Sequence, residues 1–332
     1  MNRSYTEAIN AALRDVMRDD GSVILLGEDI GELGGRFGAT QGLLASFGRA
    51  RVVDTPLVED LLAGMALGAA NGGLKPIVEF VNADFLAIAL DDLWRAGLWQ
   101  SLYGRDFASG VVVRSCFGGY AWKGPHLSSA AVGHLIAIPN VKLFAPFFPD
   151  DAYEIVRRSV REGGLTVILE HRALLLPGIP YEPYDLGRAA DLASSHPGDI
   201  ERASVLPNAA AGLRDIALVS YSYTSLVCLE AAARLEAGGV TTRVVDMKAI
   251  WPFDRETIRS VAAESRGVVL VEECAPHAGL MVHVEQDLRR ALPNIRCASV
   301  HAKDDVVPFG DRESSVLPSA ADIISASRSL LV

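Results

Sequence analysis

Two acidic residues stand where a strand gives way to an apolar helix. The stretch VVDTPLVEDLLAGMALGAANGG, residues 52–73, places Glu59 and Asp60 just before a run of small and apolar residues. One explanation is that both acids complement the helix dipole from the first turn. Another is that Glu59 faces a cleft at the carboxyl ends of parallel strands, where desolvation would raise its pKa and let it exchange a proton. The pattern alone leaves both explanations open.

Two further candidates lie beyond predicted strands. His126 stands in the loop GGYAWKGPHLSS after the apolar run GVVVRS. A lone histidine is commonly structural, but a loop beyond the carboxyl end of a strand also suits a proton carrier. Phe85 follows the run KPIVEFV, and an aromatic there serves either the core or a flat cofactor. The His126 loop also carries Tyr120, Trp122 and Lys123.

Phosphate-binding motifs are absent from the sequence. It contains no G-x-x-x-x-G-K-[ST], no G-x-G-x-x-G after a strand and no G-D-G followed by asparagines, and it also lacks the G-x-S-x-G motif of a serine nucleophile. A chain with a candidate acid and no phosphate anchor resembles half of an active site. The small residues Gly64, Gly68 and Ala69 fit tight packing within the chain or pairing with the same helix of another subunit.

The elements that must position these residues alternate between strand and helix. Ser4 and Glu7 form a capping box before a periodic helix, and short β-branched runs follow. This alternation predicts an α/β fold with two doubly wound, mainly parallel sheets. The periodicity breaks near residue 186 and resumes at DIALVSYS. We therefore expect domains at 1–185 and 214–332, joined by a linker or insertion at 186–213.

The composition excludes several classes of protein. The net charge of −10 argues against nucleic acid or an anionic membrane surface as a partner. The four cysteines are dispersed, so we expect neither a disulfide framework nor a metal site in this chain. The sequence shows no apolar run long enough to span a membrane and no signal-peptide pattern. We expect a cytoplasmic protein.

Several longer motifs carry a family resemblance. The stretches LLGEDIGELGGRFGATQGL, RVVDTPLVEDLLAGMALGAANGGLKPIVEF, ADF, VVDMKAIWPFDRETIRSV and VVLVEE resemble the beta subunit of the thiamine-diphosphate-dependent 2-oxo acid dehydrogenases. This family includes the pyruvate, branched-chain 2-oxo acid and acetoin enzymes, which are related to transketolase. The resemblance runs nearly end to end. It implies a pyrimidine-binding domain first and a transketolase-type C-terminal domain second.

The resemblance also implies roles for single residues. Glu59 matches the family acid that hydrogen-bonds the pyrimidine of thiamine diphosphate and promotes loss of the thiazolium proton, which prepares attack on the 2-oxo carbon. Phe85 matches the aromatic that packs on the pyrimidine, and Glu28 matches an acid in the same region. His126 matches a histidine that transfers protons and helps to hand the acyl unit to a lipoyl group.

The resemblance further implies partners. Diphosphate and Mg²⁺ would be held mainly by an alpha-type subunit, in a heterotetramer of two alpha and two beta chains that can associate with a lipoyl acyltransferase core. The expected activity is decarboxylation of a 2-oxo acid with transfer of the acyl unit to a lipoyl group. Alternatives are a two-component transketolase or acyloin synthase of specialised metabolism, or a non-catalytic assembly subunit.

Two segments depart from the family pattern. The loop with Tyr120, Trp122 and Lys123 is bulkier than usual, which makes these residues candidates for a substrate loop. A potassium-binding turn of some relatives would fall near Ser159, Glu162 and Gly164, but its usual Asp and Asn are missing.

Overall fold

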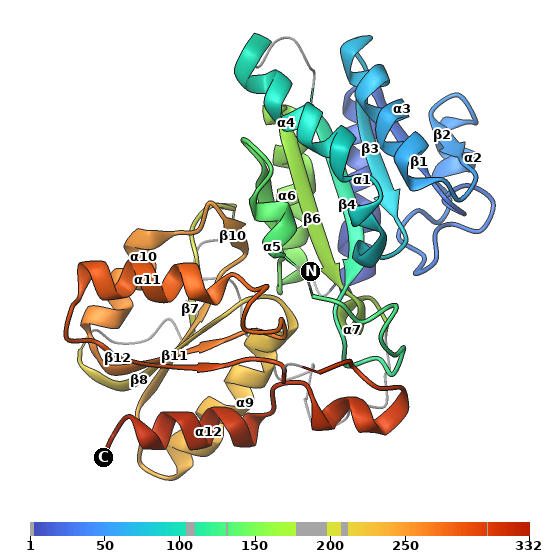
Figure 1. Ribbon diagram of the computed structural model, residues 1–332. Helices are drawn as coiled ribbons and strands as arrows, with labels where there is room; N and C mark the ends of the chain where they lie inside the picture. Colours follow the sequence, from blue (N-terminus) through green and yellow to red (C-terminus); the bar gives the residue numbers. More distant parts are fainter. Residues whose placement is uncertain (1–2, 104–109, 131, 177–197, 207–211, 304) are drawn as a thin grey trace.

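The computed structural model describes residues 3–103, 110–130, 132–176, 198–206, 212–303 and 305–332. These residues form two α/β units, one built on a seven-stranded sheet and the other on a five-stranded sheet (Figure 1). The predicted fold class is therefore confirmed. Most of the expected linker at 186–213 lies outside the described residues, so the domain limits stay a prediction. No described helix has the length and apolar character to cross a bilayer.

The first sheet has the strand order β10-β5-β6-β4-β3-β1-β2. Six strands run parallel to their neighbours, as their apolar sequences predict for a sheet buried on both faces. They are β1 (Val23–Gly27), β2 (Val52–Asp54), β3 (Lys75–Phe80), β4 (Val111–Phe117), β5 (Lys142–Phe144) and β6 (Leu165–His171). The seventh, β10 (Ala249–Trp251), pairs antiparallel with β5.

Helices cover both faces of this sheet. Val23 and Leu25 of β1 pack into the cluster that contains α1 (Tyr5–Asp19) and α6 (Pro149–Glu162). Ile24 and Leu26 point the other way, toward α3 (Glu59–Asn71) and α4 (Leu90–Tyr103). This alternation follows from the two-residue period of a strand. The shorter helical segments are α2 (Leu43–Phe47), η1 (Ala83–Ala87), α5 (Gly133–Ile136) and α7 (Arg172–Leu175). The capping box of Ser4 and Glu7 is present at the start of α1, as predicted.

The second sheet has the order β12-β11-β8-β9-β7. Its parallel strands are β8 (Arg214–Ser220), β9 (Thr242–Asp246), β11 (Ser265–Val271) and β12 (Arg296–Val300). One face packs on α9 (Tyr223–Ala237) and α12 (Ala320–Ser329), and the other on α10 (Arg255–Ala263) and α11 (Met281–Ala291). A 3₁₀ segment, η2 (Gly310–Ser315), lies in the connection before α12.

Two short antiparallel edge strands were not predicted. β7 (Ser204–Leu206) comes from the expected linker and pairs with β9 of the second sheet. β10 follows β9 in the sequence but closes the edge of the first sheet. Just before it, Lys248 donates to Asp151 of α6 at 2.8 Å, and both side chains are fully buried. The two units therefore share a polar contact and a sheet edge.

Candidate active site

The predicted site residues follow four neighbouring strands at the edge where their carboxyl ends meet. β4, β3, β1 and β2 lie side by side in that order. Glu28 follows β1 directly, and Glu59 begins α3 after β2. Phe85 lies in η1 after β3, and His126 lies in the loop after β4. Open α/β sheets bind ligands at this edge. The topology thus gathers residues that are far apart in the sequence.

Glu28 is the more enclosed of the two acids that the resemblance points to. Only 7% of its surface is exposed. Burial raises the pKa of Glu28, and the charges of Glu59 and Asp29 raise it further. The influence of Glu59 means that the two carboxyl groups lie close enough to interact. Their proximity favours a proton on Glu28 at a higher pH than is usual for a glutamate.

Glu59 and Asp60 differ in their surroundings although they are adjacent. Asp60 is exposed, and its carboxylate accepts a hydrogen bond from the backbone N–H of Leu61 at 2.8 Å. Glu59 is half-buried and lies near Glu28. Asp60 therefore fits the helix-terminus explanation. Glu59 is partly shielded from solvent, which is what the cleft explanation requires.

Phe85 and His126 are linked through the residue beside Phe85. The Asp84 carboxylate accepts a hydrogen bond from the backbone N–H of Ser129 at 3.1 Å, which joins η1 to the His126 loop. Burial raises the pKa of Asp84, and the nearby His126 partly opposes that rise. The Phe85 ring is partly buried, whereas His126 is exposed. The structure therefore places the exposed imidazole beside the segment that carries the aromatic.

The other three residues proposed for a substrate loop take two different positions. Tyr120 is buried, packs 4.9 Å from the Tyr223 ring, and donates from its hydroxyl to the Pro318 carbonyl at 2.8 Å. Trp122 is 38% exposed and Lys123 is exposed. Tyr120 thus anchors the loop, and the other two side chains reach its surface.

Comparison with known proteins decides the family. A family model described as "Transketolase, pyrimidine binding domain" matches residues 2–177, and one described as "Transketolase, C-terminal domain" matches residues 211–323. The 2-oxoisovalerate dehydrogenase subunit beta of Bacillus subtilis (strain 168) is 32% identical over 85% of this chain and 82% of its own length. The pyruvate dehydrogenase E1 component subunit beta of the same strain is 31% identical over 98% of this chain and 97% of its own length.

The chain belongs to the family of 2-oxo acid dehydrogenase beta subunits. This confirms the resemblance drawn from the sequence motifs. A solved structure described as a split gene transketolase, inactive beta4 tetramer, covers 99% of this chain and 98% of that chain. Its TM-score of 0.75 at 23% identity shows that the fold is shared.

A buried ion-pair cluster of this beta subunit was missed by the sequence analysis. Arg114 of β4 donates to Glu79 of β3 at 2.7 Å and to both carboxylate oxygens of Glu170 of β6 at 2.7 and 2.8 Å. All three side chains are buried, so breaking the cluster would leave an unpaired charge in the core. The sequence held a signal, because each of these three charges lies next to apolar residues in a buried strand. The cluster ties together the central strands whose ends carry the site.

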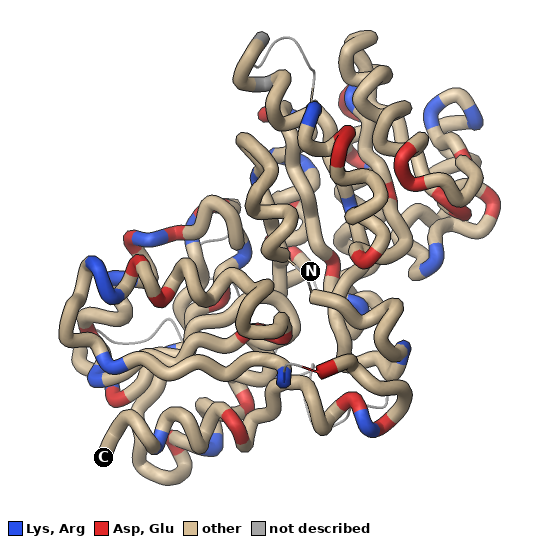
Figure 2. The backbone as a smooth tube through the Cα atoms, in the orientation of Figure 1, with Lys and Arg blue, Asp and Glu red and all other residues tan. Residues whose placement is uncertain are grey.

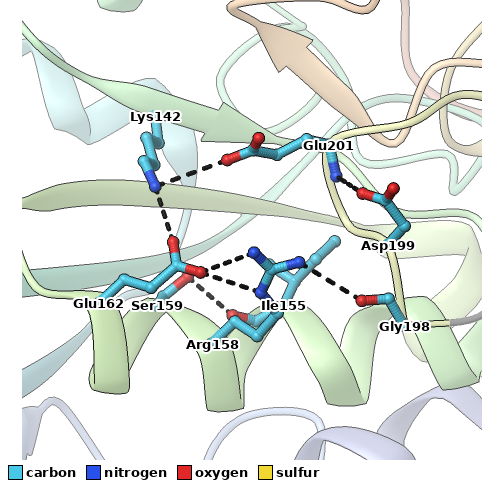
Figure 3. A network of polar contacts seen from close by, with 8 residues as sticks. All are labelled: Lys142, Ile155, Arg158, Ser159, Glu162, Gly198, Asp199 and Glu201. Carbon is cyan, nitrogen blue, oxygen red and sulfur yellow. Dashed lines mark hydrogen bonds and ion pairs between the residues drawn. The ribbon is translucent and has the colours of Figure 1, made fainter.

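Figure 3 shows a second network near the position considered for a potassium-binding turn. Glu162 accepts from Lys142 at 2.7 Å and from Arg158 at 2.7 and 2.9 Å. The Ser159 hydroxyl donates to the Ile155 carbonyl at 2.7 Å. Two basic side chains of the chain itself therefore supply positive charge at Glu162. Within the described residues, no group of three or more His, Cys, Asp or Glu could hold a metal ion.

Proposed function

We propose that this chain is the beta subunit of a two-chain thiamine-diphosphate enzyme that decarboxylates a 2-oxo acid and transfers the acyl unit to a lipoyl group. The observation that carries the proposal is the convergence of Glu28, Glu59, Phe85 and His126 at one sheet edge, in a member of this beta-subunit family. We also propose that the protein is cytoplasmic.

The residues present fit the pyrimidine half of thiamine diphosphate. The half-buried Glu59 carboxylate, with the pKa of Glu28 raised beside it, can hold a proton at a pyrimidine ring nitrogen. The partly buried Phe85 ring can contact the flat face of the pyrimidine. When bound, the cofactor supplies a carbon nucleophile and accepts the electrons left after loss of carbon dioxide.

His126 suits the proton transfers on the substrate side. Its exposure and its place in a loop after β4 allow it to meet a substrate that enters from solvent. His126 lies close enough to Asp84 to oppose the rise in the pKa of that carboxyl group. In the proposed reaction, His126 gives or takes a proton as the acyl unit leaves for its acceptor.

An exposed apolar surface beside Glu59 supports an alpha-type partner. Its side chains come from α3, α4 and the segment before α3. No lysine or arginine lies within α3 (Figure 2). Its exposed members are Leu57, Val58, Leu61, Met65, Trp94, Leu98 and Leu102. Exposed apolar patches of this kind mark interaction sites. We propose that the alpha subunit brings the diphosphate and Mg²⁺ site and forms a heterotetramer.

Two small residues of α3 fit different explanations, namely tight packing within the chain and pairing with a helix of another subunit. A side chain at Gly64 would meet the Asp92 carboxylate of α4 at 3.1 Å, so this glycine serves packing within the chain. A side chain at Gly68 would meet nothing within 4 Å. Gly68 is therefore free to accept a helix of another subunit.

Reconstitution with an alpha-type subunit tests the proposed function. The assembled enzyme, supplied with thiamine diphosphate, Mg²⁺ and a lipoyl domain, should release carbon dioxide from a 2-oxo acid and acylate the lipoyl group. Ketol transfer from a phosphorylated ketose without decarboxylation would instead identify a two-component transketolase. Failure with every 2-oxo acid and ketose would favour an assembly subunit.

A further inference from the structure

The loop that carries His126 is held by the C-terminal part of the chain. After β4, the loop approaches residues 309–318, which include η2 (Figure 1). The backbone N–H of Trp122 donates to the Glu313 carboxylate at 2.6 Å, and that of Gly119 donates to Glu273 at 3.4 Å. Lys123 also forms an isolated bridge with Phe309. The contacts are mostly to the loop backbone, so they fix its path.

Glycines allow this close approach. A side chain added at Gly119 would meet the Glu313 carboxylate at 2.6 Å, and one at Gly118 would meet Glu273 at 2.4 Å. At Gly124 it would meet the Phe309 ring at 2.3 Å. Gly118 and Gly124 also have positive φ angles of 86° and 75°. Bare backbone is therefore required at three places where the C-terminal segment lies against the loop.

Both carboxylates are buried, and Glu273 has a further partner of its own. Glu313 is fully buried, and burial raises the pKa of Glu313, while the backbone N–H groups of Tyr120 and Trp122 oppose the rise. Glu273 lies 2.9 Å from His171 Nε2. Because His171 Nδ1 accepts from the Ala173 backbone at 3.1 Å, Nε2 carries the proton and donates to Glu273. Each carboxylate thus accepts a hydrogen bond from the loop at a buried position. If the loop moved away, a buried carboxylate would lose a hydrogen-bond donor, which costs free energy.

We propose that Glu313 is a positioning residue for the active site. By holding the backbone at Trp122, it determines where Trp122, Lys123 and His126 stand over the carboxyl edge of the first sheet. The C-terminal domain thereby sets the entrance for the substrate. The hydrogen bond between Glu313 and the loop is observed in the structure. The effect of that bond on catalysis rests on the proposed function.

Hydrogen exchange tests the contact between Glu313 and the loop without an activity assay. Glu313→Ala should speed the exchange of the backbone amides of Tyr120 and Trp122 at least roughly tenfold, since their buried acceptor is gone. Glu313→Gln keeps the length and one acceptor oxygen, and should restore most of the protection at Trp122.

Glu272→Ala is the matched control. Glu272 is equally buried in the same domain, but its carboxylate accepts from the backbone of Leu280 and Met281 at the start of α11. Glu272→Ala should leave the exchange of the Tyr120 and Trp122 amides unchanged even if the domain loses stability. If exchange is unchanged in Glu313→Ala, or is accelerated equally in both alanine variants, then Glu313 does not hold the loop backbone.

Kinetics of the assembled enzyme tests the catalytic consequence. Glu313→Ala should lower kcat/KM for the 2-oxo acid roughly 10-fold to 10²-fold, because small displacements of catalytic groups are costly. Glu313→Gln should recover most of this loss, and Glu272→Ala should retain wild-type kcat/KM per assembled enzyme. If the wild type decarboxylates but Glu313→Ala matches it, the positioning role is wrong. If the wild type itself is inactive while the exchange result holds, the proposed function fails and the loop contact does not.

Discussion

The carboxyl groups of Glu28 and Glu59 interact across the ends of β1 and β2, since the charge of Glu59 adds to burial in raising the pKa of Glu28. The two residues come from separate loops after adjacent parallel strands. Removing the charge of Glu59 should therefore be visible in the titration of Glu28. This gives the candidate site a test that needs neither cofactor nor partner.

We expect Glu59→Gln to lower the pKa of Glu28 toward its ordinary value. The substitution keeps the shape of the side chain and removes the negative charge that disfavours ionisation of Glu28. Carboxyl ¹³C titration by NMR measures the change, with Asp60→Asn as the exposed neighbour for comparison. An identical Glu28 titration in wild type and Glu59→Gln would show that the two groups are not coupled.

In the assembled enzyme, Glu59→Gln should reduce turnover by roughly 10²–10⁴-fold, the usual range for loss of a group that holds a proton in catalysis. The fold should persist, since Glu59 is only half-buried. Asp60→Asn should keep most of the activity. Turnover is measured at saturating thiamine diphosphate. Activity of Glu59→Gln near that of wild type would remove Glu59 from the mechanism.

The isolated chain should bind thiamine diphosphate weakly or not at all, even with Mg²⁺. The sequence offers the pyrimidine side of a site and no diphosphate motif. Titration calorimetry of this chain alone, and then with an alpha-type subunit, measures the difference. Tight Mg²⁺-dependent binding by the chain alone contradicts the half-site interpretation.

Trp122→Ala should change the preferred substrate more than the cofactor affinity, because Trp122 reaches the loop surface. Lys123→Ala should raise KM for an anionic substrate, because it removes an attraction present in ground and transition states alike. The measurement compares kcat/KM for pyruvate, branched 2-oxo acids and phosphorylated ketoses. If both variants rank these substrates as wild type does, the loop lies outside the substrate pocket.

Asp246→Asn should make stability less dependent on pH. Burial raises the pKa of Asp246 to about 7, while its Oδ1 accepts from Ser225 at 2.6 Å, a bond that asparagine can keep. Between about pH 4 and pH 7, the unfolded chain has lost a proton that the folded chain retains, so this group makes stability fall as the pH rises. The free energy of unfolding of Asp246→Asn relative to that of the wild type should therefore increase over this pH range, by at most on the order of 4 kcal/mol. Denaturant unfolding at several pH values measures it, and a difference that does not vary with pH would refute it.

The sequence predicted those parts of the molecule that depend on local pattern. The apolar runs of β1, β3, β4 and β6 indicated a buried parallel sheet, and the capping box located the start of α1. The three-residue strands β7 and β10 are too short for any periodicity, and only tertiary pairing makes them strands.

The site shows the same division. Glu59, Phe85 and His126 were candidates from their places after strands, and the family motifs added Glu28 and a proposed role for each. Glu313 was not found, because its partner Trp122 lies far away in the sequence and no local pattern joins them. The burial of Tyr120 was also missed, since an aromatic in a glycine-rich loop gives no sign of the distant Pro318 carbonyl that it meets.

The place of β10 limits how the gene can be divided. A fragment that ended in the linker would contain six strands of the first sheet but lack the one that covers β5, and an uncovered sheet edge invites aggregation. The complementary fragment would carry Ala249–Trp251 and Lys248 without the strand and the acid that they meet. Exchange of whole domains between relatives therefore has to carry residues 248–251 along with the first domain, although the sequence places them within the second.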